Sequence, residues 1–238
     1  MSYRPVLPHV TAQVDPGFKT LVDEKRVPHD FGLTRYPRSA EASSLTDCER
    51  KLWYRWHGVP PERPNDFSAN RGAVGKAVEY QILRWLALAG ILRNEQVYLY
   101  DPMLELSGII DAVVEPEPGT FNPLEIKSVD VEGTKSGYRT KREPKEDAYV
   151  QLQAYLLMTD TEAGYLIYYD IGKLADWWAF RVPRSDEATT WIGQRCSDLS
   201  RMMPLPTPPP RPGAITSPSE YWRCGFCPYA GRCFGEDR

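Results

Sequence analysis

Two carboxylates and a lysine in the middle of the chain are residue types that can hydrolyse a phosphodiester bond. Asp111 ends the apolar run Gly-Ile-Ile-Asp, and Glu125 and Lys127 lie in Leu-Glu-Ile-Lys. Hard divalent cations such as Mg²⁺ and Mn²⁺ bind carboxylate oxygens, and they polarise phosphoryl oxygens and activate water. A metal ion held by the two acids, with Lys127 beside the attacking water, would account for all three residues.

Neighbouring strands must bring these three residues together. Glu125 and Lys127 are two residues apart, so a strand places both side chains on one face. An unpaired carboxylate within an apolar strand is costly to bury, so Asp111 needs partners, which pairing of the two strands would supply. The alternative is that Glu125 and Lys127 form a solvated strand face and Asp111 is a turn residue, because Glu-x-Lys alone is a weak pattern.

Two expected helices carry further polar residues that make this pattern more specific. Gln151 and Tyr155 are four residues apart, which places them on one helix face. Glu79 lies in an amphipathic helix between the apolar residues Val78 and Ile82. The plain alternative for Glu79 is a carboxylate on the helix surface.

Four of the five cysteines have a spacing that suits a metal centre. Cys224, Cys227 and Cys233 form a C-x2-C-x5-C pattern near the C-terminal end. Cys48 would supply a fourth thiolate and tie the tail to the rest of the fold. Four thiolates suit either Zn²⁺ or an iron–sulfur cluster, and spacing alone does not choose between these and disulfides. Cys196 falls in an expected helix, where we predict a small buried residue.

A basic loop that follows Lys127 is expected to contact DNA. Basic groups neutralise phosphates and an aromatic ring stacks on a base, which is how single-strand tracks are built. Such a charge run is usually a solvated loop, but its position beside the expected site favours DNA contact. The residues are Lys135, Tyr138, Arg139, Lys141, Arg142 and Lys145.

The overall charge neither supports nor excludes binding to nucleic acid. The chain has 29 basic and 32 acidic residues and a net charge of −3, so any DNA contact must come from a local patch. Its start, MSYRPVLPHV, lacks the apolar core of a signal peptide, and no apolar run approaches the roughly 20 residues of a membrane span. With five cysteines, these features predict a soluble protein of the cytoplasm (the host cytoplasm if viral), where thiols stay reduced.

Hydrophobic periodicity predicts a mixed α/β fold. Apolar residues at spacings of three and four indicate helices, and runs rich in Val, Ile and Tyr bounded by turn residues indicate strands. The expected order is helix 43–56, helix 71–89 ended by Gly90, strands 96–100, 104–114 and 124–129, helix 144–159 with Pro144 in its first turn, strands 164–171 and 177–182, and helix 186–202.

We predict one catalytic domain with a cysteine-tied appendage. Residues 1–40 form an N-terminal arm with little core of its own, and residues 41–202 form the catalytic domain, which also contributes Cys48. The proline-rich residues 203–218 form a stiff connector, because proline removes backbone donors. Residues 219–238 form the tail with the last three cysteines.

Several motifs occur in a fixed order: Gly75-Lys-Ala-Val-Glu79, Gly108-Ile-Ile-Asp111, Glu125-Ile-Lys127, Gln151-Leu-Gln-Ala-Tyr155 and the four outer cysteines. Together they resemble the RecB-like exonucleases of the PD-(D/E)xK superfamily, most of all the iron–sulfur branch that includes the CRISPR-associated exonuclease. The resemblance implies a restriction-endonuclease-like core, a central mixed sheet flanked by helices, with a C-terminal cysteine-cluster appendage. It also implies DNA cleavage that depends on Mg²⁺ or Mn²⁺, with a preference for single strands or frayed ends.

The resemblance assigns roles to the central acids and the lysine. It implies that Asp111 and Glu125 are metal ligands. The backbone carbonyl of Ile126 would be a third oxygen ligand. Lys127 would orient or activate the attacking water.

The resemblance also covers the two helices and the cysteines. Gln151 and Tyr155 would position the substrate phosphate or Lys127. Glu79 stands where relatives of this branch usually have histidine, and a glutamate there would still bind a metal ion but with an altered metal preference. The four outer cysteines would hold a structural [4Fe-4S] cluster, with Zn²⁺ as the alternative.

Two other classes of function stay open at this point. A non-catalytic or partner-activated DNA-end-binding subunit would keep the fold while Glu79 weakens the site, although Asp111, Glu125 and Lys127 are all present. A zinc-ribbon scaffold without a role in nucleic-acid chemistry would leave the helix and strand motifs unexplained. The sequence does not determine the polarity of digestion, or whether a helicase, recombination or integrase partner takes part.

Overall fold

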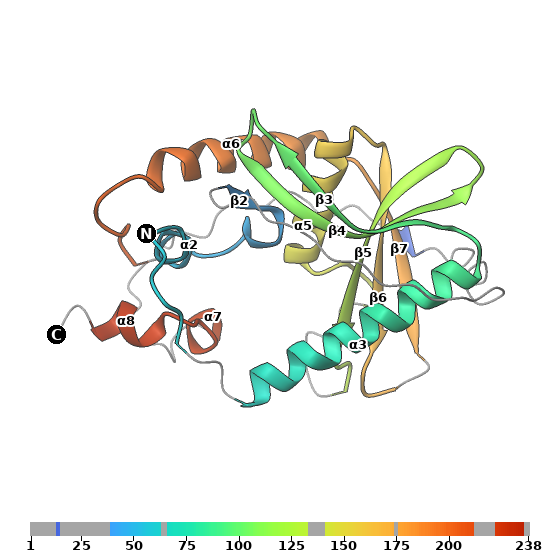
Figure 1. Ribbon diagram of the computed structural model, residues 1–238, viewed down its shortest axis with the longest axis horizontal. Coiled ribbons are helices and arrows are strands. Elements are labelled where there is room, and N and C mark those ends of the chain that lie inside the picture. Colours follow the sequence, from blue (N-terminus) through green and yellow to red (C-terminus); the bar gives the residue numbers. More distant parts are fainter. Residues whose placement is uncertain are drawn as a thin grey trace.

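The computed structural model describes residues 13–14, 39–62, 66–132, 141–173, 176–211 and 222–235 (Figure 1). The strands are β1 (Gln13–Val14), β2 (Ala40–Glu41), β3 (Leu92–Asp101), β4 (Leu106–Glu117), β5 (Thr120–Val129), β6 (Ala163–Asp170) and β7 (Trp177–Pro183). The helices are the short 3₁₀ helix η1 (Ala42–Ser44) and α2 (Glu49–Trp56), α3 (Asp66–Leu88), α5 (Glu146–Thr159), α6 (Asp186–Met202), α7 (Trp222–Gly225) and α8 (Ala230–Gly235). This is the mixed α/β fold that the periodicity predicted.

A mixed sheet forms the centre of the molecule. Its strand order is β1-β7-β6-β5-β4-β2, and β3 also pairs with β4. The β5–β6 and β2–β4 pairs are parallel, whereas β3–β4, β4–β5, β6–β7 and β1–β7 are antiparallel. Parallel neighbours need a crossover connection, and α5 supplies it between β5 and β6.

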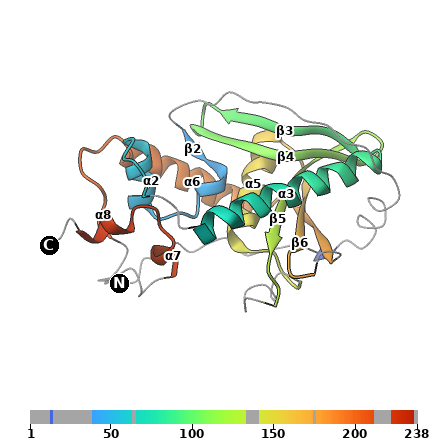
Figure 2. The same cartoon turned by 60° about the horizontal axis from the view of Figure 1, so that its bottom comes forward.

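Helices cover both faces of this sheet. On one face, α5 and α6 pack over a buried cluster that includes Tyr155 and Phe180. On the other face, α3 contributes Ile82 and Leu86 to a second buried cluster. Figure 2 shows α3 in front of β5 with α5 behind it, so the sheet is the middle layer between the two helices.

Strand β4 changes partners along its length, and this change positions the candidate site. One edge of β4 pairs with β3 from Leu106 to Val114. The other edge pairs with β2 at Leu106 and Ser107 and with β5 only from Ala112 onward. Its pairing with β5 ends at Ala112 and Leu124, and from there β5 continues in register with β6. We call the place beyond this last pair the β4–β5 fork. Residues before Ala112 on β4 and after Leu124 on β5 face each other across it.

The limits of the longest helices largely agree with the sequence. Helix α6 has the predicted limits. Helix α3 starts earlier than expected, at Asp66. Gly90 follows α3 with a φ of +72°, a left-handed conformation that ends a helix without a Cβ clash, as predicted.

Two helix starts differ from the prediction. The expected helix 43–56 is divided into two parts, η1 and α2. Cys48 is the N-cap of α2 and therefore lies just outside the helix. Pro144 lies ahead of α5, whose N-cap is Lys145 in an extended conformation. The backbone N–H of Lys145 donates to the Tyr168 hydroxyl at 2.8 Å, and this tertiary bond fixes the helix start.

The strands extend further than their apolar runs indicate. The stretch 115–123, which lies between two expected strands, is mostly strand, because β4 and β5 stay paired as far as Glu117 and Thr120. The turn is confined to the residues between them, where Gly119 has a φ of +81°. The backbone N–H of Gly119 donates to Glu115 at 2.6 Å, which closes the hairpin.

The arm and the connector are described only in part. Residues 13–14 form β1 and pair with β7, so this piece of the arm joins the sheet, while most of the arm lies outside the described residues. Residues 203–211 form neither helix nor strand, as predicted, but Trp53 donates to the carbonyl of Leu205 at 2.9 Å and packs this segment against α2. Residues 212–218 lie outside the described part. No described helix is long and apolar enough to cross a membrane.

Gly164 permits the close contact between β6 and its neighbours. A Cβ there would lie 2.7 Å from the carbonyl oxygen of Pro123 and 3.0 Å from a Leu152 methyl group. We therefore expect Gly164→Ala to lower the free energy of unfolding by about 1–3 kcal/mol. Gly193→Ala in α6 is the matched control, because a Cβ there meets nothing within 4 Å and should raise stability by about 1 kcal/mol. Urea unfolding measures both, and equal effects would contradict the expected clash.

Candidate active site

Asp111, Glu125 and Lys127 meet at the β4–β5 fork. Lys127 Nζ lies 2.6 Å from Glu125 Oε1. The backbone N–H of Ile126 donates to Asp111 Oδ2 at 2.8 Å, so a side chain joins the two strands where their backbone ladder has ended. Asp111 lies within β4, so its interpretation as a turn residue is wrong. The Glu125 side chain is only 4% exposed, so Glu125 and Lys127 do not form a solvated strand face.

A chain of hydrogen bonds from α5 holds Lys127. The ammonium donates to Gln151 Oε1 at 2.9 Å, and Gln151 Nε2 donates to the Tyr155 hydroxyl at 2.8 Å. The Tyr155 hydroxyl in turn donates to the carbonyl of Ile109 on β4 at 2.7 Å. The ring fits because Gly108 has no Cβ, which would lie 2.6 Å from Tyr155 Cε1. The structure thus brings together Lys127, Gln151 and Tyr155.

Helix α3 brings a third carboxylate, Glu79, whose side chain is 16% exposed. Its Oε1 accepts from Gln96 Nε2 at 2.6 Å, and its Oε2 accepts from Lys76 Nζ at 2.7 Å. The sequence did not single out Gln96 or Lys76. No sequence pattern marks Gln96. It reaches Glu79 only because of the register in which β3 pairs with β4, and this register cannot be read from local spacing.

The three carboxylates lie close enough to affect one another. Burial raises the pKa of Asp111 well above its ordinary value, and the charges of Glu125 and Glu79 raise it further. Burial also raises the pKa of Glu125, although Lys127 opposes this effect. The three carboxylates therefore repel one another when they ionise, and Lys127 offsets only part of this repulsion.

Lys127 stays protonated in this surrounding. Burial alone would lower its pKa, but the adjacent Glu125 carboxylate raises the pKa above the usual value. Burial and the charge of Glu125 likewise raise the pKa of Tyr155 well above normal. Both groups are therefore hydrogen-bond donors at neutral pH.

The donor set suits a hard divalent cation. Buried Glu125 Oε2 has no hydrogen-bond partner within the described ranges, and such buried acceptors normally have one. Carboxylate oxygens are the ligands that Mg²⁺ and Mn²⁺ prefer. In the present arrangement, no three His, Cys, Asp or Glu side chains of the described residues form a group that could hold a metal ion. The carboxylates would have to rotate from their present partners to bind one.

The expected DNA-contacting loop is described only at its end. Lys135, Tyr138 and Arg139 lie outside the described residues. Lys141 Nζ forms an ion pair with Asp176 at 2.5 Å and lies 5.3 Å from the centre of the Trp178 ring. The other two residues of this set, Arg142 and Lys145, are exposed and half-buried respectively.

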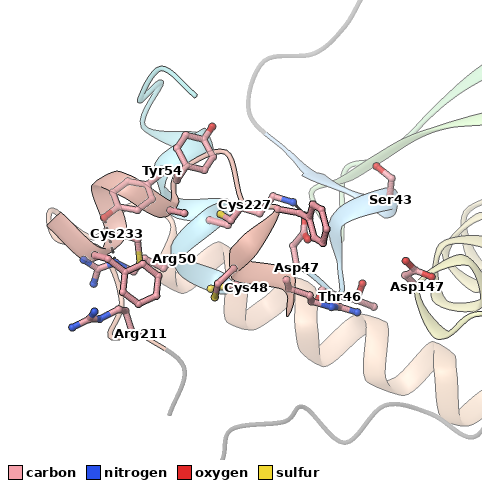
Figure 3. A pocket seen from close by; sticks show the side chains of 17 residues that line it. Ser43, Thr46, Asp47, Cys48, Arg50, Tyr54, Asp147, Arg211, Cys227 and Cys233 are labelled. Atoms are coloured by element: carbon pink, nitrogen blue, oxygen red, sulfur yellow. Dashed lines mark hydrogen bonds and ion pairs between the residues drawn. The ribbon is translucent and has the colours of Figure 1, made fainter. Parts of the chain in front are cut away.

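The four outer cysteines line one cavity of about 220 Å³ between α2 and the tail. Figure 3 shows Cys48, Cys227 and Cys233 around it, with Asp147 from α5 at a distance from them. Burial and then the neighbouring thiols raise the pKa of Cys224 to about 11. The sequence predicted that Cys48 lies near the three cysteines of the tail, and the fold places all four at one cavity.

Protein contacts hold this cavity together. The carbonyl groups of residues 45–47, directly before Cys48, accept from two arginines. Arg195 of α6 donates to the first and the last of them at 3.0 and 2.9 Å, and Arg223 of α7 donates to the middle one at 2.6 Å. The sequence marked neither arginine, because both contacts join distant segments.

Cys196 is separate from this cavity. It is buried in α6, 3% exposed, as predicted. Burial raises the pKa of its thiol to about 12, so it stays a neutral, apolar group.

Comparisons with known proteins bear on the fold. A sequence profile described as the PD-(D/E)XK nuclease superfamily matches residues 22–234. Curated proteins give no match. The crystal structure of SSO0001 has 16% identity and a TM-score of 0.51, with 84% of this chain and 88% of that chain covered.

Two structures of one further protein are also similar. The alkaline exonuclease LHK-Exo from Laribacter hongkongensis has 16% identity and a TM-score of 0.51, with 69% of this chain and 89% of that chain covered. Its complex with dAMP has 18% identity and a TM-score of 0.52, with the same coverage. At these identities the likeness shows a shared fold.

Removing the charge of Asp111 should stabilise the protein in the absence of metal ions. Asparagine can still accept from the Ile126 N–H, while the repulsion from Glu125 and Glu79 is lost. We expect Asp111→Asn to raise the melting temperature in EDTA by about 2–4 °C, which corresponds to about 1 kcal/mol. Thermal unfolding followed by circular dichroism measures this, with exposed Glu117→Gln as the control. An unchanged or lower melting temperature for Asp111→Asn would show that the carboxylates do not repel one another as described.

Proposed function

Since the chain belongs to the PD-(D/E)XK nuclease superfamily, we propose that it is a divalent-metal-dependent DNA exonuclease that acts on single strands or DNA ends. The observation that carries the proposal is the β4–β5 fork, where one oxygen of buried Glu125 holds Lys127 while the other finds no partner among the described residues. The fold is shared with the alkaline exonuclease LHK-Exo, whose complex with the deoxynucleotide dAMP supports DNA as the substrate proposed for this chain.

The carboxylates of Asp111, Glu125 and Glu79 would hold the metal ion. The carbonyl of Ile126 would add a backbone oxygen. When bound, Mg²⁺ or Mn²⁺ polarises a phosphoryl oxygen and makes a bound water more acidic. The mutual repulsion of these carboxylates supports this assignment, because a divalent cation would offset it.

Lys127 would position the attacking water or a phosphate oxygen. Glu125 and Gln151 accept two of its N–H groups, so one N–H is left for the substrate. In the reaction, water forms a new bond to phosphorus, the bond from phosphorus to the leaving sugar oxygen breaks, and that oxygen takes up a proton. Tyr155 would act on Lys127 indirectly, since it fixes Gln151 to β4.

The basic loop would bind the DNA backbone beside this site. Lys141 and Arg142 are exposed, and a surface ion pair such as that of Lys141 with Asp176 contributes little stability, so phosphate can replace the Asp176 carboxylate. Lys145, Lys135, Tyr138 and Arg139 complete the proposed contact set. Cleavage of single strands would suit a loop that combines basic groups with an aromatic ring.

The four outer cysteines would hold a [4Fe-4S] cluster, which would place the protein in the iron–sulfur branch. The observation behind this is that all four line one cavity, although the thiols would have to move closer together to bind, since as they stand no three of the described ones form a metal-holding group. Four thiolates fit either iron–sulfur or Zn²⁺. The cluster would be structural and would tie Cys48 to the tail. An intracellular setting such as the cytoplasm would keep these thiols reduced. A helicase, recombination or integrase partner would act with the protein in the same compartment.

The division of the chain into arm (1–40), nuclease domain (41–202), connector (203–218) and tail (219–238) is part of this proposal. The bond from Arg223 to the carbonyl of Thr46 and the bond from the Gly231 N–H to Glu62 support a tail docked on the nuclease domain. The tail would then move with the domain as one unit.

Substitution of Lys127 tests the nuclease directly. We expect Lys127→Ala to slow the release of end label from single-stranded DNA by about 10²- to 10⁴-fold in Mn²⁺ or Mg²⁺, with no release in EDTA. Tyr155→Phe should slow it by about tenfold, because Gln151 loses its fixed partner. Exposed Lys173→Ala is the matched lysine control and should behave as the wild type.

Two results would count against the nuclease. Undiminished digestion by Lys127→Ala would show that the activity comes from elsewhere. DNA binding without any metal-dependent digestion by the wild type would favour the non-catalytic DNA-end-binding subunit instead.

Substitution of one cysteine at a time tests the cluster. We expect protein purified without oxygen to contain iron and acid-labile sulfide, and Cys224→Ser to lose both and to unfold at a lower temperature. Cys196→Ser is the matched control and should keep its iron, because Cys196 lies outside the cavity. Zinc in place of iron would favour a zinc site, and metal content that does not depend on Cys224 would contradict both.

A further inference from the structure

Gln96 of β3 reaches the candidate site from the strand on the far side of β4. The residues on either side of it pair with the residues on either side of Asp111, namely Glu95 with Ala112 and Val97 with Ile110. Gln96 therefore lies across from Asp111. A third strand thus contributes to a site that the motifs place on β4 and β5.

The backbone of Gln96 is strained. Its φ is +49°, in the left-handed region where the Cβ of an L-residue approaches the backbone oxygen. Glycine would adopt this conformation without that cost. A residue with a side chain at such a position costs stability, and conformations of this kind cluster at functional sites as well as at turns and helix ends.

The side chain of Gln96 has a specific partner. Its Nε2 donates to Glu79 Oε1 at 2.6 Å, and Glu79 is close enough for its charge to act on Asp111 and Glu125. The other oxygen of Glu79 accepts from Lys76, whose side chain is 73% exposed. An exposed lysine holds a carboxylate weakly, so the amide of Gln96 is the firmer of the two contacts.

We propose that Gln96 is a positioning residue that fixes Glu79 Oε1 and leaves Glu79 Oε2 to bind the metal ion. An amide suits this task because it is neutral: it orients the carboxylate without cancelling the charge that attracts a cation. Lys76 can move into solvent when a divalent cation arrives, whereas Gln96 is held by its strand. The inference rests on the proposed metal site and adds a residue to it.

The decisive measurement is Mn²⁺ binding without DNA, followed by the electron paramagnetic resonance signal of free Mn²⁺. We expect Gln96→Gly to bind Mn²⁺ about 10- to 100-fold more weakly than the wild type, the usual effect of losing a partner that orients a ligand. In EDTA the same variant should melt at the same or a higher temperature, because glycine relieves the strained φ. Gln96→Asn should behave like Gln96→Gly in binding, since its amide is one methylene short of Glu79.

Two controls separate positioning from a structural effect. Glu105 has a φ of +48° in the turn between β3 and β4, so Glu105→Gly relieves a similar strain away from the site and should leave Mn²⁺ binding unchanged. In a Glu79→Gln background, Gln96→Gly should cause little further loss of Mn²⁺ affinity, because the two residues act through one contact.

Three outcomes would overturn the proposal. These are wild-type Mn²⁺ affinity in Gln96→Gly, an equal loss in Glu105→Gly, and a full loss that persists in the Glu79→Gln background. Failure of the proposed function looks different. A wild type that digests no DNA, but whose Mn²⁺ affinity falls in Gln96→Gly as expected, keeps this inference and rejects the exonuclease.

Discussion

The hydrogen bond from the Ile126 backbone to the Asp111 carboxylate is the contact on which the site depends. It stands at the point where β4 and β5 stop pairing, so an acidic side chain, not a backbone carbonyl, completes the link between the strands. A buried carboxylate is costly, and this donor fixes it in one orientation. Glu125 and Lys127 follow on β5, and the fork gives them room that an unbroken ladder would fill.

The site shows how a fold can hold charges that would separate in water. Asp111, Glu125 and Glu79 come from β4, β5 and α3, and each rigid element carries one of them. Lys127 balances part of this charge, and α5 fixes it through Gln151 and Tyr155. Stability would be higher with fewer carboxylates, because each adds repulsion that only a bound cation, as proposed, would offset.

The tail meets the rest of the fold through contacts that need no metal ligand. From the tail, Arg223 donates to the carbonyl of Thr46 at 2.6 Å and the backbone N–H of Gly231 in α8 donates to Glu62 at 2.7 Å. Arg195 of α6 holds the carbonyls on either side of Thr46 from the nuclease domain. Figure 1 shows α7 and α8 beside α2, away from the sheet. The cysteine cavity therefore lies between two surfaces that the protein itself brings together.

The sequence by itself determined the order and type of the main elements, because periodicities of two and 3.6 residues are local properties. It also identified the motif residues, since Glu125 and Lys127 share a strand face and Gln151 and Tyr155 share a helix face by spacing alone. Only the tertiary structure decided the fork, the strand extension through residues 115–123, the strained Gln96 and the arginines that hold Cys48's loop. These features depend on strand register and on hydrogen bonds between segments far apart in the chain, which no local pattern encodes.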